Sequence, residues 1–353
     1  MLYIIVAILM FGVLIAVHEL GHFLTAKILG VRVNEFAIGM GPAFFKRQKG
    51  ETLYSLRAFP IGGYCAMEGE DEVTDDPKAF TAQPIWKRLI ILVAGSFMNF
   101  LAGFLIILLL FSQSQSFNTP VISGFADGFE LEGESGLQVG DRILKVDGEN
   151  IYIFSDISIF FSRSNGETMD LLIERDGEEI LLEDFPLQAK EYIQDGQTVT
   201  RYGIDFTNVP ATFGMRIREA WFNAVDFVRL VRVSLTDLIT GAAGLRDMSG
   251  PIGIVDTLGQ VGRESGSTGA AMMNILYFAA LIAINLAVMN LLPIPALDGG
   301  RIFFLLVTGI ITLVTKKKVD PKYEGYIHFA GMICLLGLMV VVAVSDVLKL
   351  VGR

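Results

Sequence analysis

The chain has 353 residues, of which 52% are hydrophobic and 19% are charged, and its mean hydropathy is +0.53. Soluble globular domains usually carry about 25% charged residues, so this composition argues against a purely soluble protein. Most of the acids behind the formal net charge of −10 lie between residues 113 and 270, which gives no reason to expect nucleic acid as a partner.

The first apolar block runs from Leu2 to about Leu29 and contains the pentapeptide His18-Glu19-Leu20-Gly21-His22. A signal peptide is the ordinary interpretation of an apolar N-terminus, but this block has no basic segment before it and no small-residue cleavage site after it. Ionisable groups inside an apolar span are costly, and where they occur they usually serve a function. We therefore expect this block to be a membrane span that carries chemistry.

The spacing within the pentapeptide indicates a zinc site. Residues four apart share one face of a helix, so His18 and His22 can direct their imidazole nitrogens at one metal ion. Glu19 follows the first histidine and is placed to act as the general base. The alternative is a pair of core histidines. It is less favoured, because two of the chain's three histidines flank a glutamate at this spacing inside a span.

Glycine and proline interrupt the segment from residue 30 to residue 84, so a helix is not expected there. The runs 52–56 and 64–67 read as β-hairpin strands. Non-helical backbone at membrane depth is tolerated where it is buried in protein or lines a watery cavity. We expect a re-entrant β-hairpin beside the active site.

Three further apolar blocks follow, at about 85–111, 270–314 and 327–348. The block at 270–314, the third of the whole chain, is too long for one straight helix and is broken by prolines and glycines. The sequence thus predicts a polytopic α-helical membrane protein with about four spans, and both termini on one side.

Basic residues orient these spans. The cluster 46–49 and the run 316–318 fall in the segments 30–84 and 315–325, which the four-span arrangement places on the same side. The excess of Lys and Arg makes that side cytoplasmic, so the acidic region 113–270 is expected to be extracytoplasmic.

Residues 119–208 read as a compact β-rich domain, because Asp147-Gly148 and Asp176-Gly177 are strong hairpin turns. Helical spacing of apolar residues over 211–240 predicts an amphipathic helix that leads back to the membrane. The expected division of the chain is as follows: 1–112 for the first two spans, 113–210 for the β-rich domain, 211–269 for an amphipathic helical connector and 270–353 for the last two spans.

A catalytic zinc usually has three protein ligands, so a third must come from elsewhere in the chain. His328 is one candidate, near the start of the last span. Asp298 is the better one, because it follows two prolines and precedes two glycines in a broken helix, and broken helices form ligand sites at membrane depth. The alternative for Asp298 is a helix N-cap.

These motifs together resemble the site-2 protease family of intramembrane zinc metalloproteases. The pentapeptide at 18–22 and the late Asn290-Leu291-Leu292-Pro293-Ile294-Pro295-Ala296-Leu297-Asp298-Gly299-Gly300 carry the resemblance. The stretch 135–148 resembles part of a PDZ domain of the kind found in the bacterial sigma-factor-regulating members. Gly62-Gly63-Tyr64, Gly95-Ser96-Phe97-Met98-Asn99 and Ser249-Gly250-Pro251-Ile252-Gly253 are further matches, so the resemblance covers nearly the whole chain.

The resemblance implies a Zn²⁺ cofactor held by His18, His22 and Asp298, with Glu19 as base. It also implies that Asn285, Asn290, Pro293 and Pro295 position substrate. The expected activity is cleavage of single-span membrane proteins, already cut in their ectodomain, such as anti-sigma factors or signal-peptide remnants. The expected location is the bacterial cytoplasmic membrane, with the PDZ-like domain extracytoplasmic and the lipid bilayer as a partner.

The sequence also departs from the family pattern. Ser96 stands where a proline is common, a single PDZ-like domain fits, and the usual carboxylate-binding loop is not evident. Two other classes of protein are less favoured. A transporter would show repeat symmetry and ligands spread over several spans. A non-catalytic adaptor would have no use for a general base.

Overall fold

The computed structural model describes residues 2–70, 74–164, 167–194, 197–244, 248–316 and 321–351. The chain divides into two compact units, one formed by residues 1–107 with 227–353 and the other by residues 108–226. The first unit is mainly helical and the second is rich in β-strands. Lys317 and Lys318, two members of the expected basic run, lie outside the described residues.

Five helices in the described part of the chain are long and apolar enough to cross a membrane, where about four spans were expected. They belong to α1 (Leu2–Leu29), α2 (Ile85–Phe111), α6 (Thr268–Asn290), α7 (Asp298–Thr315) and α8 (Pro321–Val351). The difference arises in the third apolar block, which forms two helices, α6 and α7. Between them the chain turns at Leu291–Leu297, because the two prolines there cannot continue a helix.

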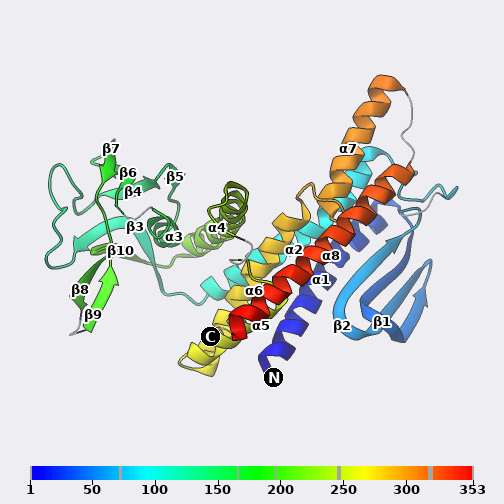
Figure 1. The fold of residues 1–353 in the computed structure, drawn as a ribbon, viewed down its shortest axis with the longest axis horizontal. Coiled ribbons are helices and arrows are strands. Elements are labelled where there is room, and N and C mark those ends of the chain that lie inside the picture. The colour runs from blue at the N-terminus through cyan, green and yellow to red at the C-terminus, as the bar shows by residue number, and fades with distance from the viewer. Residues whose placement is uncertain are drawn as a thin grey trace. The chain divides into compact units, whose positions relative to one another are not determined.

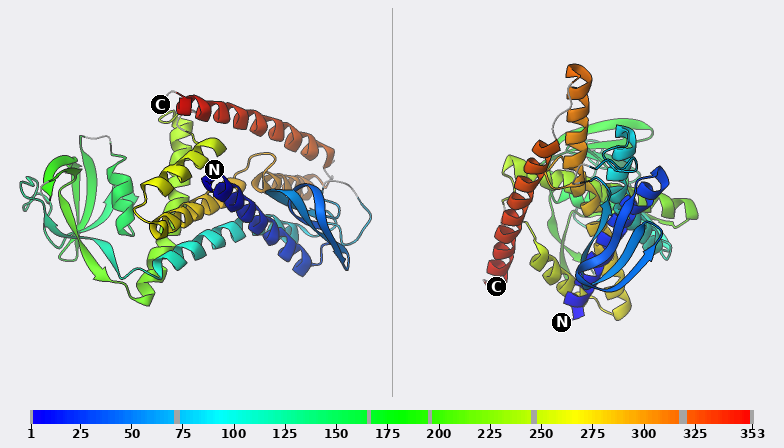
Figure 2. Two further views of the ribbon diagram at one scale, coloured as in Figure 1. Left: turned by 90° about the horizontal axis from the view of Figure 1, so that it is seen from below. Right: turned by 90° about the vertical axis from the view of Figure 1, so that its right-hand side faces the viewer.

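The order and direction of these helices follow from Figure 1 and Figure 2. Helix α7 continues in the direction of α6, and both views of Figure 2 agree on this. The beginning of α1 and the end of α8 lie at the same end of the helical unit.

The expected hairpin is present and is longer than the sequence suggested. Strands β1 (Val33–Lys49) and β2 (Thr52–Met67) pair from Lys49 opposite Thr52 onward, and the hairpin lies beside α1 (Figure 1). The pair is folded back on itself, so Phe36 stands opposite both Tyr54 and Cys65. Gly39, Gly41 and Gly62 adopt positive φ, which a glycine reaches without strain, and this permits the reversal.

Contacts between helix ends and neighbouring elements fix the helical unit. Lys87 of α2 donates its Nζ to the carbonyl of Leu29 at the end of α1, at 2.9 Å. Gly250 is the N-cap of helix α5 (Pro251–Glu264), and the carboxylate of Asp346 on α8 accepts from the amides of Gly250 and Gly253, both at 2.9 Å. Arg301 of α7 pairs with Glu70, which follows β2.

The β-rich unit contains a six-stranded sheet with the strand order β10-β3-β4-β6-β7, and β5 pairs with β4. The strands are β3 (Ser116–Phe125), β4 (Arg142–Val146), β5 (Glu149–Asn150), β6 (Met169–Arg175), β7 (Glu178–Phe185) and β10 (Ile204–Pro210), with β8 (Lys190–Gln194) and β9 (Gln197–Arg201) as a separate hairpin. The two Asp-Gly turns connect β4 to β5 and β6 to β7, with positive φ at all four residues, as the sequence predicted.

Helix α3 (Phe154–Phe161) contributes Ile157, Phe160 and Phe161 to the core of this unit, against buried strand residues such as Ile143 and Leu171. Helix α4 (Phe213–Thr240) follows β10 and is the amphipathic helix expected over 211–240. It exposes Phe213, Ile217 and Trp221, which are four residues apart and share one face.

Candidate metal centre

Helix α1 presents two histidines to one point. His18 and His22 are 8% and 6% exposed, and their Nε2 atoms lie 3.2 Å apart. The regular geometry of the helix is responsible, because residues four apart stand one above the other on the same face. The pair expected from the sequence is therefore brought together inside an apolar helix.

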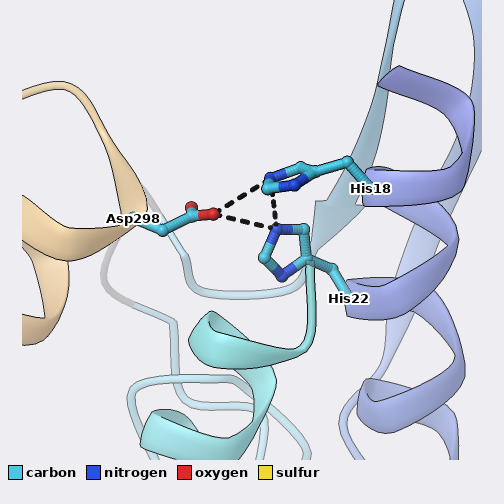
Figure 3. Close-up of side chains that lie close together, drawn as sticks. All are labelled: His18, His22 and Asp298. Atoms are coloured by element: carbon cyan, nitrogen blue, oxygen red, sulfur yellow. Dashed lines mark hydrogen bonds and ion pairs between the residues drawn. The ribbon is translucent and has the colours of Figure 1, made fainter. Parts of the chain in front are cut away.

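Asp298 reaches the same point from α7. It is the first residue of that helix, and its Oδ2 lies 3.0 Å from Nε2 of His18 and 3.3 Å from Nε2 of His22. Figure 3 shows the three side chains pointing toward one another from two different helices. They form the one group of three or more potential ligands found among the residues that the structure describes.

The spacing of these three atoms fits a zinc ion. Ligands placed roughly 2.0–2.1 Å from a tetrahedral zinc are separated from one another by about 3.3 Å. The three separations here, 3.0, 3.2 and 3.3 Å, have that size. Oδ2 of Asp298 is buried and accepts no hydrogen bond within the described chain, as expected of an oxygen whose partner is a cation.

The outer nitrogen of each imidazole decides which nitrogen is free to bind a metal. Nδ1 of His22 lies 2.8 Å from the carbonyl oxygen of Ile91, to which it can only donate, so Nε2 keeps its lone pair. Nδ1 of His18 lies 3.5 Å from the side-chain amide of Asn99, whose Oδ1 is buried without a partner. Exchanging the amide oxygen and nitrogen would let the oxygen accept from Nδ1 of His18, which leaves Nε2 of His18 free as well.

Helix α2 can approach the imidazoles because Gly95 has no side chain. A Cβ at this position would lie 2.4 Å from Nε2 of His22 and 2.8 Å from Nε2 of His18. Gly21 allows the reciprocal approach, since its Cβ would lie 2.3 Å from the carbonyl oxygen of Ala94. In the sequence, Gly95 and Asn99 stand out only as part of a motif. Their roles depend on the packing of α1 against α2, which local patterns do not encode.

Glu19 stands beside this cluster, next to the hairpin. Its carboxylate is within electrostatic reach of His18, His22 and Asp298, and the backbone of Cys65 in β2 is a hydrogen-bonding partner. A Cβ on Gly63 would lie 3.8 Å from Cγ of Glu19, so the strand passes directly alongside the side chain. The arrangement places one proton acceptor between the ligand cluster and a segment of β-strand.

The other expected site residues lie on α6 and on the turn before Asp298. Asn285 is on α6 with an exposed side chain, and Asn290 is the last residue of that helix. Pro293 and Pro295 form part of the turn itself. His328, the rival third ligand, is not in the cluster; its Nδ1 accepts from the backbone amide of Ala296 at 2.9 Å.

Comparison with known proteins decides the family. Residues 6–338 match the sequence profile of peptidase family M50. The chain belongs to that family. It is the site-2 protease family that the motifs indicated, and its members include proteins named as zinc metalloproteases.

Individual relatives agree over their whole length. A protein of Clostridium perfringens with a zinc metalloprotease name is 35% identical over 98% of this chain and 99% of its own. The regulator of sigma-W protease RasP of Bacillus subtilis is 29% identical, over 97% of each chain. The zinc metalloprotease RasP of Bacillus licheniformis is 28% identical, over 97% of this chain and 98% of its own. This chain is accordingly a zinc metalloprotease, and its apolar helices make it a multi-pass membrane protein.

Proposed function

We propose that this M50 protein cuts membrane protein substrates within their membrane-spanning segments, with His18, His22 and Asp298 as zinc ligands and Glu19 as the general base. The observation that carries the proposal is the meeting of two imidazole Nε2 atoms and one carboxylate oxygen within 3.3 Å, on helices apolar enough to lie in a membrane. Three unprotonated ligand atoms facing one another inside apolar helices require a cation.

Zinc bound at this cluster would supply Lewis acidity, which polarises the peptide carbonyl and lowers the pKa of a water toward ~7. Glu19 then accepts the proton of the attacking water and can pass it to the leaving amine. Its position beside the three ligands suits this role, because a general base must lie within hydrogen-bonding reach of the proton it takes.

The hairpin would hold the substrate extended. A transmembrane helix hides its carbonyls in hydrogen bonds, so a stretch of it must unwind before cleavage. Within the described chain the segment 63–66 pairs with β1 on one side, and Gly63 lies next to Glu19. A substrate strand that pairs with β2, within residues 52–67, would run beside the base. Asn285, Asn290, Pro293 and Pro295 would position it from α6 and the following turn.

We further propose four membrane crossings, with α6 and α7 sharing the third. The common direction of α6 and α7 and the shared end of α1 and α8 support this arrangement (Figure 1). Lys46, Arg47 and Lys49 are exposed near the tip of the hairpin and favour a cytoplasmic position for it. The PDZ-like domain, within residues 113–210, would then be extracytoplasmic and the protein would reside in a bacterial cytoplasmic membrane.

Orientation can be tested by cysteine labelling in a Cys334→Ser background, which removes the exposed native thiol. Cysteine in place of Glu178, on β7, should react with an impermeant reagent in intact cells. Cysteine in place of Arg47 should react only after the membrane is permeabilised. Labelling with the opposite sidedness would overturn the topology.

The β-rich unit is proposed to select substrates by size. It contains none of the residues assigned to chemistry, and both its ends continue into helices of the other unit. A bulky folded ectodomain would collide with it, so substrates such as anti-sigma factors or signal-peptide remnants would first need a cut elsewhere. The relative named for sigma-W regulation supports this class of substrate.

The activity itself is tested with a single-span substrate in detergent or vesicles. Mass spectrometry of the products should place the cut inside the apolar segment, and the cut should disappear with a chelator and return with zinc. For the size filter, residues 119–208 are replaced by a flexible linker. A linker enzyme that is folded and zinc-loaded should accept a large-ectodomain substrate that the intact enzyme rejects. Equal rejection by both enzymes would contradict the filter.

A further inference from the structure

The turn that precedes Asp298 contains a residue in an unfavourable backbone conformation. Ala296 has φ +77°, in the left-handed region where Cβ crowds the following carbonyl. Such conformations persist when the surrounding structure holds them in place. Ala296 lies two residues before the proposed zinc ligand, so whatever holds this turn also affects the position of the carboxylate.

One contact that holds the turn comes from α8. The backbone amide of Ala296 donates to Nδ1 of His328 at 2.9 Å. The ring of His328 also packs edge-on against Phe304 of α7, with ring centroids 5.5 Å apart. To accept this hydrogen bond the imidazole must be neutral and carry its hydrogen on Nε2.

A second contact lies one turn along α8. A Cβ on Gly331 would lie 2.3 Å from Cβ of Pro295 and 2.9 Å from its carbonyl oxygen. His328 and Gly331 are three residues apart and so share a helix face. Together they form the surface of α8 that contacts Pro295 and Ala296.

The turn is also pressed against the first residues of α7. A Cβ on Gly299 would lie 2.2 Å from the carbonyl oxygen of Leu292, and a Cβ on Gly300 would lie 2.3 Å from that of Ile294. With this packing the turn and the start of α7 cannot move independently, because protein interiors leave no space for it. A shift of Ala296 therefore carries Asp298 with it.

We infer that His328 is a positioning residue of the metal centre, which holds the left-handed Ala296 in place and thereby fixes the Asp298 carboxylate against His18 and His22. The inference rests on the proposed role of Asp298 as a zinc ligand. His328, the third histidine of the chain, then supports the metal centre by its hydrogen bond to the backbone of Ala296 and does not bind the metal itself.

The test compares zinc retention among purified full-length variants challenged with a chelator. His328→Phe keeps a ring against Phe304 but cannot accept the hydrogen bond. Supporting residues of metal sites typically contribute 10–100-fold to metal affinity, so we expect about 10-fold or faster zinc release. His328→Asn is the matched control: its Oδ1 can occupy the place of Nδ1 and accept from Ala296, so release should stay within about 3-fold of wild type.

A double variant separates positioning from mere packing. Glycine adopts positive φ without strain, so Ala296→Gly should make the turn less dependent on His328. We expect His328→Phe to accelerate zinc release much less in the Ala296→Gly background than in the wild type, with a coupling that contacting residues commonly show. Equal acceleration in both backgrounds would overturn the role through Ala296, as would unchanged zinc retention in His328→Phe.

Failure of the inference and failure of the proposed site are distinguishable. If His22→Ala retains zinc, the ligand assignment fails. If His22→Ala loses zinc while His328→Phe keeps it, only the role of His328 fails.

A measurement on the unmodified enzyme covers the case in which His328→Phe does not fold. The chain has three histidines, so isotope-labelled histidine gives few nitrogen NMR signals. One signal should show hydrogen on Nε2 and should vanish in His328→Asn, whereas the other two should show hydrogen on Nδ1. A signal from His328 with hydrogen on Nδ1 would contradict the inference.

Discussion

The β-rich unit and the helical unit both bury ionisable side chains, but they surround them differently. In the β-rich unit, Asp141 is 1% exposed, and its carboxylate accepts from Nε and Nη2 of Arg175, each at 2.7 Å, and from the amide of Gln138 at 2.8 Å. Asp156 is fully buried and accepts from the amides of Tyr152 and Ile153 at the start of α3. Each of these carboxylates is matched by donors of the chain itself.

In the helical unit the buried groups meet acceptor to acceptor. Nε2 of His18, Nε2 of His22 and Oδ2 of Asp298 face one another, and the hydrogen bond from His22 to the carbonyl of Ile91 keeps a hydrogen off the Nε2 of His22. With both imidazoles neutral and both Nδ1 atoms donating, none of these three atoms carries a hydrogen to share with the others. Burial alone thus does not identify a site. On the proposed assignment, the difference is that the β-rich unit supplies donors to its buried carboxylates, whereas the helical unit leaves that place to a cation.

The largest effect that would sharpen this contrast is expected from His22→Ala. Zinc affinity should fall by more than about 100-fold, the upper range for residues that only support a ligand. Asp141→Asn is the matched change in the β-rich unit. It should lower the stability of that unit by about 2 kcal/mol, through a weakened ion pair, and leave zinc content unchanged. Metal analysis and hydrogen exchange of both variants would measure the two effects. Zinc loss in Asp141→Asn would contradict the distinction between the buried carboxylates of the β-rich unit and the metal centre of the helical unit.

The next effect concerns Gly95, the glycine beside the proposed ligands. Gly95→Ala places a Cβ where the imidazole of His22 now lies, so the ring must move and zinc affinity should fall about 10–100-fold. Gly103→Ala on the same helix is the control, because its Cβ would meet Ile284 of α6, away from the cluster. That variant should lose stability but bind zinc normally. Similar zinc affinity in the two variants would argue against a close approach of α2 to the ligands.

A smaller effect is expected from Asn99. Asn99→Asp keeps an oxygen that can accept from Nδ1 of His18 and should bind zinc at least as tightly as wild type. Asn99→Leu removes the acceptor and should bind about 10-fold more weakly. Chelator competition measures both. If Asn99→Leu binds like wild type, the amide does not orient His18.

The smallest effect lies in the β-rich unit and depends on pH. Burial raises the pKa of Glu219 on α4 from its ordinary value of 4.5 to about 7, with the nearby Arg218 opposing this and Asp156 reinforcing it. Because the folded-state pKa is raised, the stability that Glu219 contributes is full below about pH 4.5 and is lost as pH rises through about 7. At alkaline pH the ionised Glu219 lowers the free energy of unfolding by at most about 3 kcal/mol.

Glu219→Gln removes that penalty, and the amide oxygen can still accept from Arg218. The variant should match wild type at about pH 4.5 and be the more stable of the two at about pH 8. Hydrogen exchange of α3 and α4 in the full chain measures the difference. A wild type as stable as Glu219→Gln at alkaline pH would show that the carboxylate is better solvated than its burial implies.

Local patterns predicted the parts of the molecule that local geometry controls. The spacing of His18 and His22 determines their common face, and the Asp-Gly turns determine two hairpins of the β-rich unit. The third apolar block was recognised as broken, but its separation into α6 and α7, each long enough to span, requires the observed turn. The folding back of β1 on β2 was likewise not predictable, because it depends on which strands meet in space.

The residues of the site likewise fall into those that local sequence could indicate and those that only tertiary packing explains. Asp298 could be singled out from its broken helix and its motif, but its approach to α1 is a property of tertiary packing. Gly95 has no chemical group to attract notice, and only the position of the imidazoles explains it. His328 looked like a rival ligand, because a sequence cannot tell a nitrogen that binds metal from one that accepts a backbone hydrogen bond.

The measurement that tests the central claim most directly is a paired assay of zinc content and cleavage on Glu19→Gln. Glutamine has nearly the same size and can accept from the backbone of Cys65, but it cannot take a proton from water. We predict about one zinc per chain, as in wild type, together with a loss of at least about 100-fold in cleavage of a single-span substrate. A Glu19→Gln enzyme that holds its zinc and cuts at the wild-type rate would contradict it.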